Sequence, residues 1–300
     1  MDLSDFTKDN SENAILKSIV PQICKDEPCC LGIDEAGRGP VLGPMVYGVS
    51  FCPLSCKEKL EQLGFADSKT LSEEQRDELF SKIKDANDFL GFEVEILSPN
   101  YISKTMLRRT KYSLNAISMD SAIGLLRLAI EQGANIKEVY VDTVGDASKY
   151  QEKLQGLFPR LEITVTPKAD AKFPIVSAAS ICAKVVRDQV LKSWIFFEGD
   201  DIVTRDYGSG YPSDPATKHW LADNMDKVFG YPQFVRFSWS TTSTLLENKA
   251  YHVHWDDEDE DESAKGTASL FSFFAPKNAD PRDKQHSFFE ERHLKRVESF

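Results

Sequence analysis

Residues 32–40 read GIDEAGRGP, so two adjacent acids stand at the end of an apolar strand with a glycine-rich turn directly behind them. A buried strand has no physical reason to end in two carboxylates unless a positive group meets them there. A divalent metal ion is the obvious candidate. Because side chains alternate along a strand, we expect the strand to break at or just after Glu35. Gly37 and Gly39 allow that break and let backbone amides approach a ligand closely.

The composition is that of a globular protein. Three hundred residues, 41% of them hydrophobic, suggest one large domain or two small ones with a substantial core. No apolar run approaches the roughly 18 residues of a membrane helix, and the acidic start lacks the features of a signal peptide. The sequence therefore predicts a soluble, intracellular protein with no membrane partner.

The net charge of −12 argues superficially against a nucleic-acid substrate, because phosphate contacts normally require a basic surface. The distribution of the charge weakens this objection, because Asp256 to Glu262 are consecutive acids. Bound divalent cations would also reverse the sign of the local charge near any metal ligands. Two interpretations stay open. Either other subunits supply basic surface, or the contacts with a polyanion are few and local.

The six cysteines favour reduced, mostly buried thiols. They form no CxxC pair and have no histidine at zinc-ligand spacing nearby, so the sequence does not predict a structural zinc site.

The pattern along the chain predicts a mixed α/β fold. After a polar arm, residues 29–35, 43–52 and 89–97 have the composition of consecutive antiparallel strands. Between them, Ser72 and Gln75 have capping-box spacing at the start of a helix, and a second helix begins near Leu114 and ends at Gly133. Strands at 139–142 and 161–165, separated by a helix over 147–157, indicate a parallel crossover.

The second half of the chain is predicted to be largely helical. Residues 175–194 form a helix rich in small residues that packs closely against a neighbour, and the chain to about residue 249 is helical around a structured loop at 205–215. We therefore divide the chain into an N-terminal arm (1–27), a catalytic domain (28–200), a C-terminal helical extension with a substrate-contacting loop (201–250), and an acidic linker and tail (251–300).

Four carboxylates are candidate metal ligands because each falls where a strand or helix ends: Asp34, Glu35, Asp142 and Asp170. Acids that converge at one edge of a sheet repel one another unless cations neutralise them, and oxygen ligands suit Mg²⁺ or Mn²⁺ rather than zinc. Two ions about 4 Å apart could activate a water and stabilise the leaving oxygen of a phosphodiester. Asp170 has an alternative interpretation as the cap of the helix that follows Pro174.

Six motifs in order resemble the type 2 ribonucleases H, also called ribonuclease HII. They cover roughly residues 28–240 and comprise 34–40 (DEAGRGP), 67–71 (DSKTL), 139–142 (VYVD), 168–170 (KAD), 177–181 (SAASI) and 208–212 (GSGYP). Within that family, the chain is most similar to the catalytic chain of the heterotrimeric eukaryotic members. The resemblance implies a ribonuclease H-like fold, with a mixed five-stranded sheet of three antiparallel strands followed by two parallel ones, flanking helices and a C-terminal helical extension.

The resemblance also implies roles for the site residues. Asp34, Glu35, Asp142 and Asp170 would be the catalytic, metal-binding acids. The turn Gly37, Arg38 and Gly39 would read the 2′-hydroxyl that distinguishes RNA from DNA. Tyr211 would stack on the sugar of the next nucleotide, although a hydrophobic plug is its alternative interpretation. Further substrate contacts would come from Lys69, Lys168, Ser177 and Lys184, with Arg187 a weaker candidate.

Near the C-terminus, Thr267, Leu270, Phe273 and Phe274 have the spacing of a sliding-clamp-binding box, although Thr267 replaces the usual glutamine. The alternative is an amphipathic segment that docks on this chain or on a partner chain, and we favour that alternative.

The function that the resemblance implies is hydrolysis of RNA strands in RNA/DNA hybrids and of single ribonucleotides embedded in duplex DNA. Cleavage 5′ of the ribonucleotide by two metal ions would leave 3′-hydroxyl and 5′-phosphate ends. A heterotrimer with two non-catalytic subunits, location in the nucleus, and roles in ribonucleotide removal from DNA and in Okazaki primer removal follow from the same resemblance. Two alternatives stay open: a non-catalytic scaffold, and a type 1-like enzyme that needs several consecutive ribonucleotides.

Overall fold

The computed structural model describes residues 3–252 apart from 66–70, 144 and 200–202. The described residues up to Asn248 belong to one compact unit. None of the helices in the described part of the chain combines the length and the apolar character needed to span a lipid bilayer.

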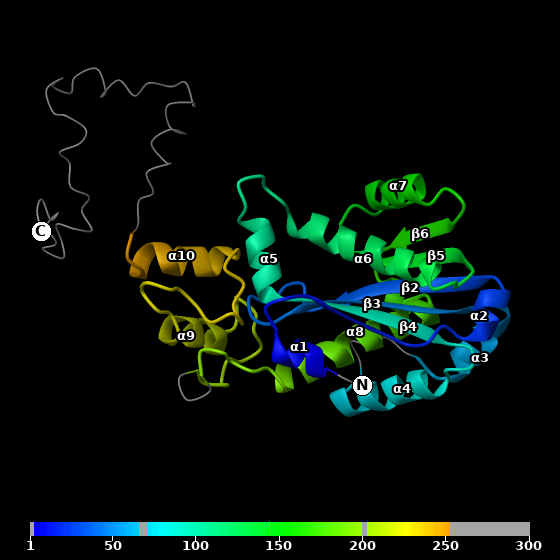
Figure 1. Ribbon diagram of the computed structural model, residues 1–300, viewed down its shortest axis with the longest axis horizontal. Helices are drawn as coiled ribbons and strands as arrows, with labels where there is room; N and C mark the ends of the chain where they lie inside the picture. The colour runs from blue at the N-terminus through cyan, green and yellow to red at the C-terminus, as the bar shows by residue number, and fades with distance from the viewer. Residues whose placement is uncertain (1–2, 66–70, 144, 200–202, 253–300) are drawn as a thin grey trace, which may run out of the picture. The chain divides into compact units, whose positions relative to one another are not determined.

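A mixed sheet forms the centre of this unit, with its strands in the order β1-β4-β3-β2-β5-β6 (Figure 1). The first four strands in that order pair antiparallel, whereas β2, β5 and β6 pair parallel. The strands are β1 (Ala14–Lys17), β2 (Cys29–Ala36), β3 (Met45–Pro53), β4 (Gly91–Leu97), β5 (Ile136–Asp142) and β6 (Glu162–Thr166). The expected combination of three antiparallel strands and two parallel ones is confirmed, and β2 ends just after Glu35 as its glycines indicate.

The expected number of five strands is wrong by one, because β1 comes from the segment interpreted as a polar arm. Its four residues are too few to show a period-two pattern, and only pairing with β4 stabilises them. Ala14 and Leu16 pack against the core, while Lys17 lies opposite Glu93 in the ladder. A strand that gains its order from a distant partner leaves little trace in its own sequence.

Helices cover both faces of the sheet (Figure 1). One core cluster lies between the sheet and α8 with α4, and the other lies between the sheet and α6 with part of α7. The helices of this part of the chain are α1 (Ser4–Lys8), α2 (Gln22–Asp26), α3 (Lys57–Gln62), α4 (Glu73–Asp85), α5 (Pro99–Met106), α6 (Leu114–Glu131), α7 (Ala147–Leu157) and α8 (Pro174–Lys192). The predicted capping box at the start of α4 is confirmed, since Ser72 and Gln75 exchange both hydrogen bonds.

Helix α8 lies unusually close to the sheet, as its small residues predict. A β-carbon added at Gly32 would lie 2.5 Å from the backbone of Ile175, and one added at Gly48 would lie 2.6 Å from the carbonyl oxygen of Ala179. Both values are far below van der Waals contact, so glycine is required at these strand positions. This contact fixes α8 against β2 and β3, the strands that lead to the candidate acids.

The C-terminal extension contains α9 (Pro215–Asp223) and α10 (Ser240–Lys249), joined by an irregular segment. Phe234 is fully buried and contacts a group of aromatic rings, namely Trp194, Phe196, Tyr207 and Trp220. These contacts hold the loop that carries Tyr211 and the segment around Arg236 against the body of the domain.

Candidate active site

Two of the candidate acids are neighbours at the carboxyl end of adjacent parallel strands. In the ladder between β2 and β5, Ile33 lies opposite Val141, so the next residues, Asp34 and Asp142, follow side by side. Parallel strands place their carboxyl ends at the same edge of a sheet, where many α/β proteins bind ligands. Strand pairing thus brings together two acids that are far apart in the sequence.

Asp34 is a buried carboxylate in a negative environment. Its side chain is 5% exposed and accepts a 2.7 Å hydrogen bond from the backbone N–H of Glu35. Burial raises the pKa of Asp34 well above its ordinary value, and the charges of Glu35 and Asp142 raise it further, while a hydrogen bond with Ser180 opposes the rise. A nearby cation would relieve the repulsion that these three acids share.

Glu35 points away from Asp34, as the alternation of a strand demands. It lies opposite Tyr47 of β3, and burial together with the Glu35 charge raises the pKa of the Tyr47 hydroxyl. Glu35 also lines two cavities, one of about 930 Å³ and one of about 310 Å³. It therefore stands where both cavities meet the end of β2.

Asp170 reaches the same edge through a short 3₁₀ turn, Ala169–Ala171, just before α8. Its carboxylate is almost fully buried, and the backbone N–H of the preceding Ala169 donates a 2.8 Å hydrogen bond to Oδ1 of Asp142. The alternative role as a helix cap is not supported, because Phe173 occupies the N-cap position of α8. Asp170 thus lies beside Asp142 rather than at the helix end.

Among the residues that the structure describes, no group of three or more acids, histidines or cysteines is arranged so that it could already hold a metal ion. Asp34 and Asp142 each accept a hydrogen bond from a backbone amide, and Glu35 leaves the strand on the other face. The donor set nevertheless fits a hard divalent cation, because it consists of carboxylate oxygens. Burial and then the charges of Glu35 and Asp142 raise the pKa of Asp34, and a cation would offset both effects.

The turn behind the acids requires glycine. Gly37 has φ of +74°, and an added β-carbon would lie 2.0 Å from Nε of Arg187. At Gly39, an added β-carbon would lie 2.9 Å from Cε1 of Tyr211. The aromatic ring therefore lies directly against the turn, and the glycines are needed because Arg187 and Tyr211 occupy the space that a β-carbon would take.

The turn is held in place by Arg236 and Trp239, two residues that sequence reasoning missed. Arg236 is fully buried and donates to the carbonyl oxygens of Gly37 (2.6 Å), Arg38 (3.1 Å) and Gly43 (2.8 Å). Its guanidinium lies over the ring of Trp239, whose indole N–H donates to the carbonyl oxygen of Gly39 at 3.1 Å. The available signal was an arginine inside the apolar run 234–239 (FVRFSW), where an unpaired charge would be costly.

The Arg38 side chain extends toward α6, where it donates to Ser118 and Asn115. This direction makes Arg38 part of the wall between the two cavities, both of which it lines. A phosphate contact by Arg38 would therefore occur at the boundary of the two cavities.

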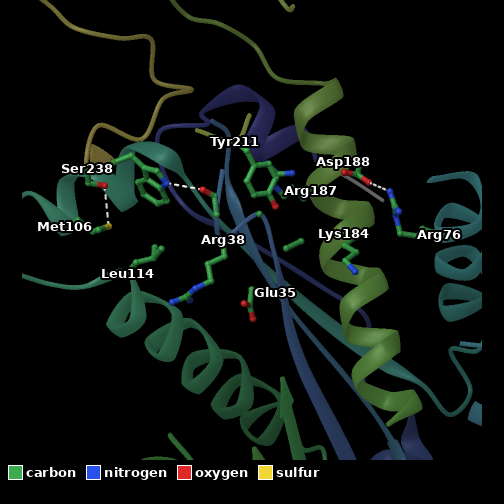
Figure 2. Close-up of a pocket in the computed structure, with 14 residues that line it drawn as sticks. Glu35, Arg38, Arg76, Met106, Leu114, Lys184, Arg187, Asp188, Tyr211 and Ser238 are labelled. Carbon is green, nitrogen blue, oxygen red and sulfur yellow. Dashed lines mark hydrogen bonds and ion pairs between the residues drawn. The ribbon is translucent and has the colours of Figure 1, made fainter. Parts of the chain in front are cut away.

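The larger cavity is a cleft whose two sides come from different parts of the chain (Figure 2). Lys184, Arg187 and Asp188 come from α8, while Met106 and Leu114 lie on the other side, with Glu35 and Arg38 between them. Arg187 donates to the carbonyl oxygen of Pro44 at 3.1 Å, and its side chain lies against Gly37 of the turn. Lys184 also lines the cleft.

The loop that presents Tyr211 is tied to the turn by backbone hydrogen bonds. The N–H of Val41 donates to the carbonyl oxygen of Gly210 at 2.8 Å, and the Thr217 hydroxyl accepts from the N–H of Gly210 at 3.0 Å. Asp214 stabilises the same loop by accepting from the N–H and hydroxyl of Ser209. Tyr211 itself is 48% exposed, so it is not a hydrophobic plug.

Two other candidates line neither cavity, and a third is not among the described residues. Lys168 adopts a left-handed conformation, with φ of +56°, ahead of Asp170 and lines neither cavity. Ser177 is buried in α8 and lines neither cavity. Lys69 lies outside the described residues, as does the segment from Thr267 to Phe274.

Comparison with known proteins links this geometry to one family. The family model described as "Ribonuclease HII" matches residues 31–242. The A subunit of ribonuclease H2 from Bos taurus is 53% identical over 294 residues, covering 98% of each chain. Its counterpart from Homo sapiens is 51% identical over 300 residues, covering all of both chains.

Solved structures agree with the sequence comparison. The ribonuclease H2 of Pyrococcus horikoshii OT3 has a TM-score of 0.61 and 34% identity, covering 73% of this chain and 98% of that one. The RNase HII chain in the complex with PCNA from Archaeoglobus fulgidus has a TM-score of 0.59 and 32% identity, covering 76% of this chain and 99% of that one.

Proposed function

The chain belongs to the ribonuclease HII family, and from that premise we propose that it removes ribonucleotides from DNA as well as RNA strands from hybrids. The family assignment makes it an endoribonuclease of the ribonuclease H type, acting on RNA in RNA/DNA hybrids. The finer proposal is that it also cuts at a single ribonucleotide within duplex DNA. Incision on the 5′ side would leave 3′-hydroxyl and 5′-phosphate ends.

One observation carries this proposal: the Tyr211 ring lies against Gly39, in the same cleft as Glu35. A ring and an exposed backbone turn, a few residues from a cluster of acids, can examine one sugar next to the bond that is cut. The 2′-hydroxyl is the group that distinguishes RNA from DNA at such a position. A site of this size needs only one ribose for recognition.

The acids Asp34, Glu35, Asp142 and Asp170 would hold two Mg²⁺ or Mn²⁺ ions, which when bound supply activation of water and stabilisation of the leaving oxygen. The charges of Glu35 and Asp142 beside Asp34 would attract such ions. The backbone of residues 37–39 would bind the 2′-hydroxyl, and Arg236 and Trp239 keep that backbone in position. Lys184 and Arg38 would contact phosphates on either side.

Further parts of the proposal come from the relatives. The mammalian relatives are each one lettered subunit of an enzyme, which indicates an assembly, so we propose that this chain is the catalytic member of a heterotrimer with two non-catalytic partners. The archaeal relative solved with PCNA supports a clamp contact as a further proposal. A nuclear location and roles in ribonucleotide excision and Okazaki primer removal accord with this activity.

Cleavage assays on three duplexes test the proposal: one with a single ribonucleotide, one with a run of RNA opposite DNA, and one of DNA alone. With Mg²⁺, the wild-type assembly should cut the first two, and a sequencing gel should place the cut 5′ of the single ribonucleotide. Asp34→Asn should reduce kcat by about 10²- to 10³-fold, the range over which removal of a central electrostatic group acts.

Three results would contradict the proposal. Cleavage of the RNA run without cleavage of the single ribonucleotide would indicate the type 1-like preference. Full activity of Asp34→Asn would remove the acids from the mechanism, and no activity on any duplex would leave a scaffold role.

A further inference from the structure

A basic loop joins α5 to α6 in an otherwise acidic chain. Residues 104–113 read KTMLRRTKYS, with four basic residues and no acid, whereas the chain as a whole has a net charge of −12. We call residues 107–113 the α5–α6 loop. Neither the cleft acids nor the glycine turn accounts for this local excess of positive charge.

The loop projects from one wall of the cleft. Met106 immediately precedes it and Leu114 immediately follows it, and both of these residues line the cleft. Figure 2 shows them across from the α8 residues Lys184 and Arg187, with Glu35 and Arg38 between the two sides. The loop therefore stands beside the position where the scissile strand would lie.

The basic side chains of the loop are exposed to solvent, and neighbouring groups hold Arg108 in position. Residues 107–111 are all exposed, and Leu107 is 60% exposed. Arg108 donates from Nε to the carbonyl oxygen of Thr105 at 3.0 Å, and its guanidinium lies 4.5 Å from the centre of the Tyr112 ring. The Tyr112 hydroxyl in turn donates to Asp120 of α6. These contacts orient Arg108 and reduce the entropy that it would lose on binding an anion.

We propose that Arg108, Arg109 and Lys111 form a second phosphate-binding surface, which contacts the backbone of the duplex beside the cleft. This inference rests on the proposed nuclease function and adds to it a determinant of affinity. Contacts with phosphate position a protein on a duplex but carry no information about the sugar. The loop should therefore govern how tightly a duplex binds, whereas the glycine turn and Tyr211 govern which duplex is cut.

The test compares two full-length variants that lose the same charge. The first is Arg108→Gln, Arg109→Gln, Lys111→Gln. The second, a matched control, is Lys25→Gln, Lys59→Gln, Lys137→Gln, whose three exposed lysines lie at the opposite edge of the sheet, near the start of β2, the end of β3 and the start of β5. Each binds a 20-base-pair DNA duplex with one ribonucleotide, without divalent metal, over a series of salt concentrations.

For the loop variant we expect the slope of log binding constant against log salt concentration to be smaller in magnitude by about 2 to 3. Each neutralised phosphate contributes about 0.9 to that slope. In Mg²⁺, its KM should rise roughly tenfold at physiological salt with kcat within twofold of wild type. The ratio of activity on the single ribonucleotide to that on an RNA run should stay unchanged. The control variant should match wild type in slope and KM.

An unchanged salt slope in the loop variant would overturn the inference, and so would equal losses in both variants, because only net charge would then matter. A wild-type protein that cuts no ribonucleotide-containing duplex would instead defeat the proposed function. The two failures are separable, because the binding series does not depend on cleavage.

Discussion

Arg236 is a buried cationic side chain whose guanidinium is hydrogen-bonded to backbone carbonyl oxygens. Three of its N–H groups donate to Gly37, Arg38 and Gly43, and burial lowers the pKa of Arg236 well below its ordinary value. A lysine would keep a charge but could not reach three carbonyls that diverge around a planar guanidinium. We expect Arg236→Lys to lower kcat/KM on the single-ribonucleotide duplex at least tenfold and the free energy of unfolding by about 2 kcal/mol.

Arg205→Lys is the matched control, because Arg205 also donates to a carbonyl oxygen, that of Trp194, and lies over an aromatic ring, that of Phe196. These contacts lie at Trp194 and Phe196 rather than at the glycine turn. Wild-type kcat/KM in Arg236→Lys, or an equal loss in Arg205→Lys, would show that Arg236 does not act through the turn.

Gly37 should be intolerant of even one methyl group. Its φ of +74° disfavours any L side chain, and the added β-carbon would collide with Arg187. Gly64 has a similar φ of +81° but open space around the same atom. Comparing Gly37→Ala with Gly64→Ala therefore separates the collision from the backbone strain.

We expect Gly64→Ala to lower the free energy of unfolding by about 1 kcal/mol, and Gly37→Ala by at least about 2 kcal/mol more with most of the activity lost. Urea denaturation measures both values. Similar losses in the two variants would mean that Arg187 moves aside without consequence, and that the close fit of the turn is not needed.

At the scale of elements, strand β4 carries a buried acid that should make stability depend on pH. Glu93 is fully buried, accepts a 2.6 Å hydrogen bond from Gln132 at the end of α6, and has a pKa that burial raises to about 7. The unfolded chain releases this proton near pH 4.5. Between these values the folded state binds more protons, so stability falls as pH rises from about 4.5 to about 7.

The fall due to Glu93 should total about 3 kcal/mol, and Glu93→Gln should remove it, leaving the variant more stable than wild type at pH 7.5. Thermal unfolding over the pH range 4.5–8 measures the difference between the two proteins. Glu131→Gln, which changes an exposed acid on the last turn of α6, is the control. If Glu93→Gln gave the pH dependence of wild type, the acid would not be the buried group that titrates.

Most elements could be predicted because their signals are local. The β2 and β3 strands are long and apolar, the α7 bounds match the helical pattern, and the capping box at Ser72 marks the start of α4. Strand β1 escaped because four residues carry no periodicity of their own. Its order depends on β4, which lies some 80 residues away in sequence.

Some residues of the candidate site could likewise be predicted from local sequence, and others could not. Asp34 and Asp142 could be placed from sequence because each ends an apolar strand and parallel pairing brings such ends together. Arg236, Trp239 and Ser180 could not, since their contacts with residues 34–43 join segments that only the folded chain brings together. A buried arginine or serine is recognised by its partners, and a single sequence does not reveal partners at long range.

At the scale of the whole molecule, the described residues up to Asn248 form two hydrophobic core clusters among themselves. The two clusters on either face of the sheet contain the buried apolar residues of this part of the chain, and the extension around Phe234 completes one of them. We therefore keep the boundary near residue 250 as a proposal. A protein of residues 1–252 should fold, since all residues of the two clusters precede residue 249.

Deleting residues 253–300 should leave the melting temperature within about 2 °C of the full-length value, because the free energy of unfolding follows the apolar area that is buried. The same deletion removes the acids from Asp256 to Glu262, and the truncated chain should therefore bind duplex nucleic acid at least as tightly. As a control, deletion from residue 232 removes Phe234 and Arg236 and should prevent folding. A melting temperature more than about 5 °C lower for residues 1–252 would show that the C-terminal segment contributes to the core, and the boundary would then have to lie further along the chain.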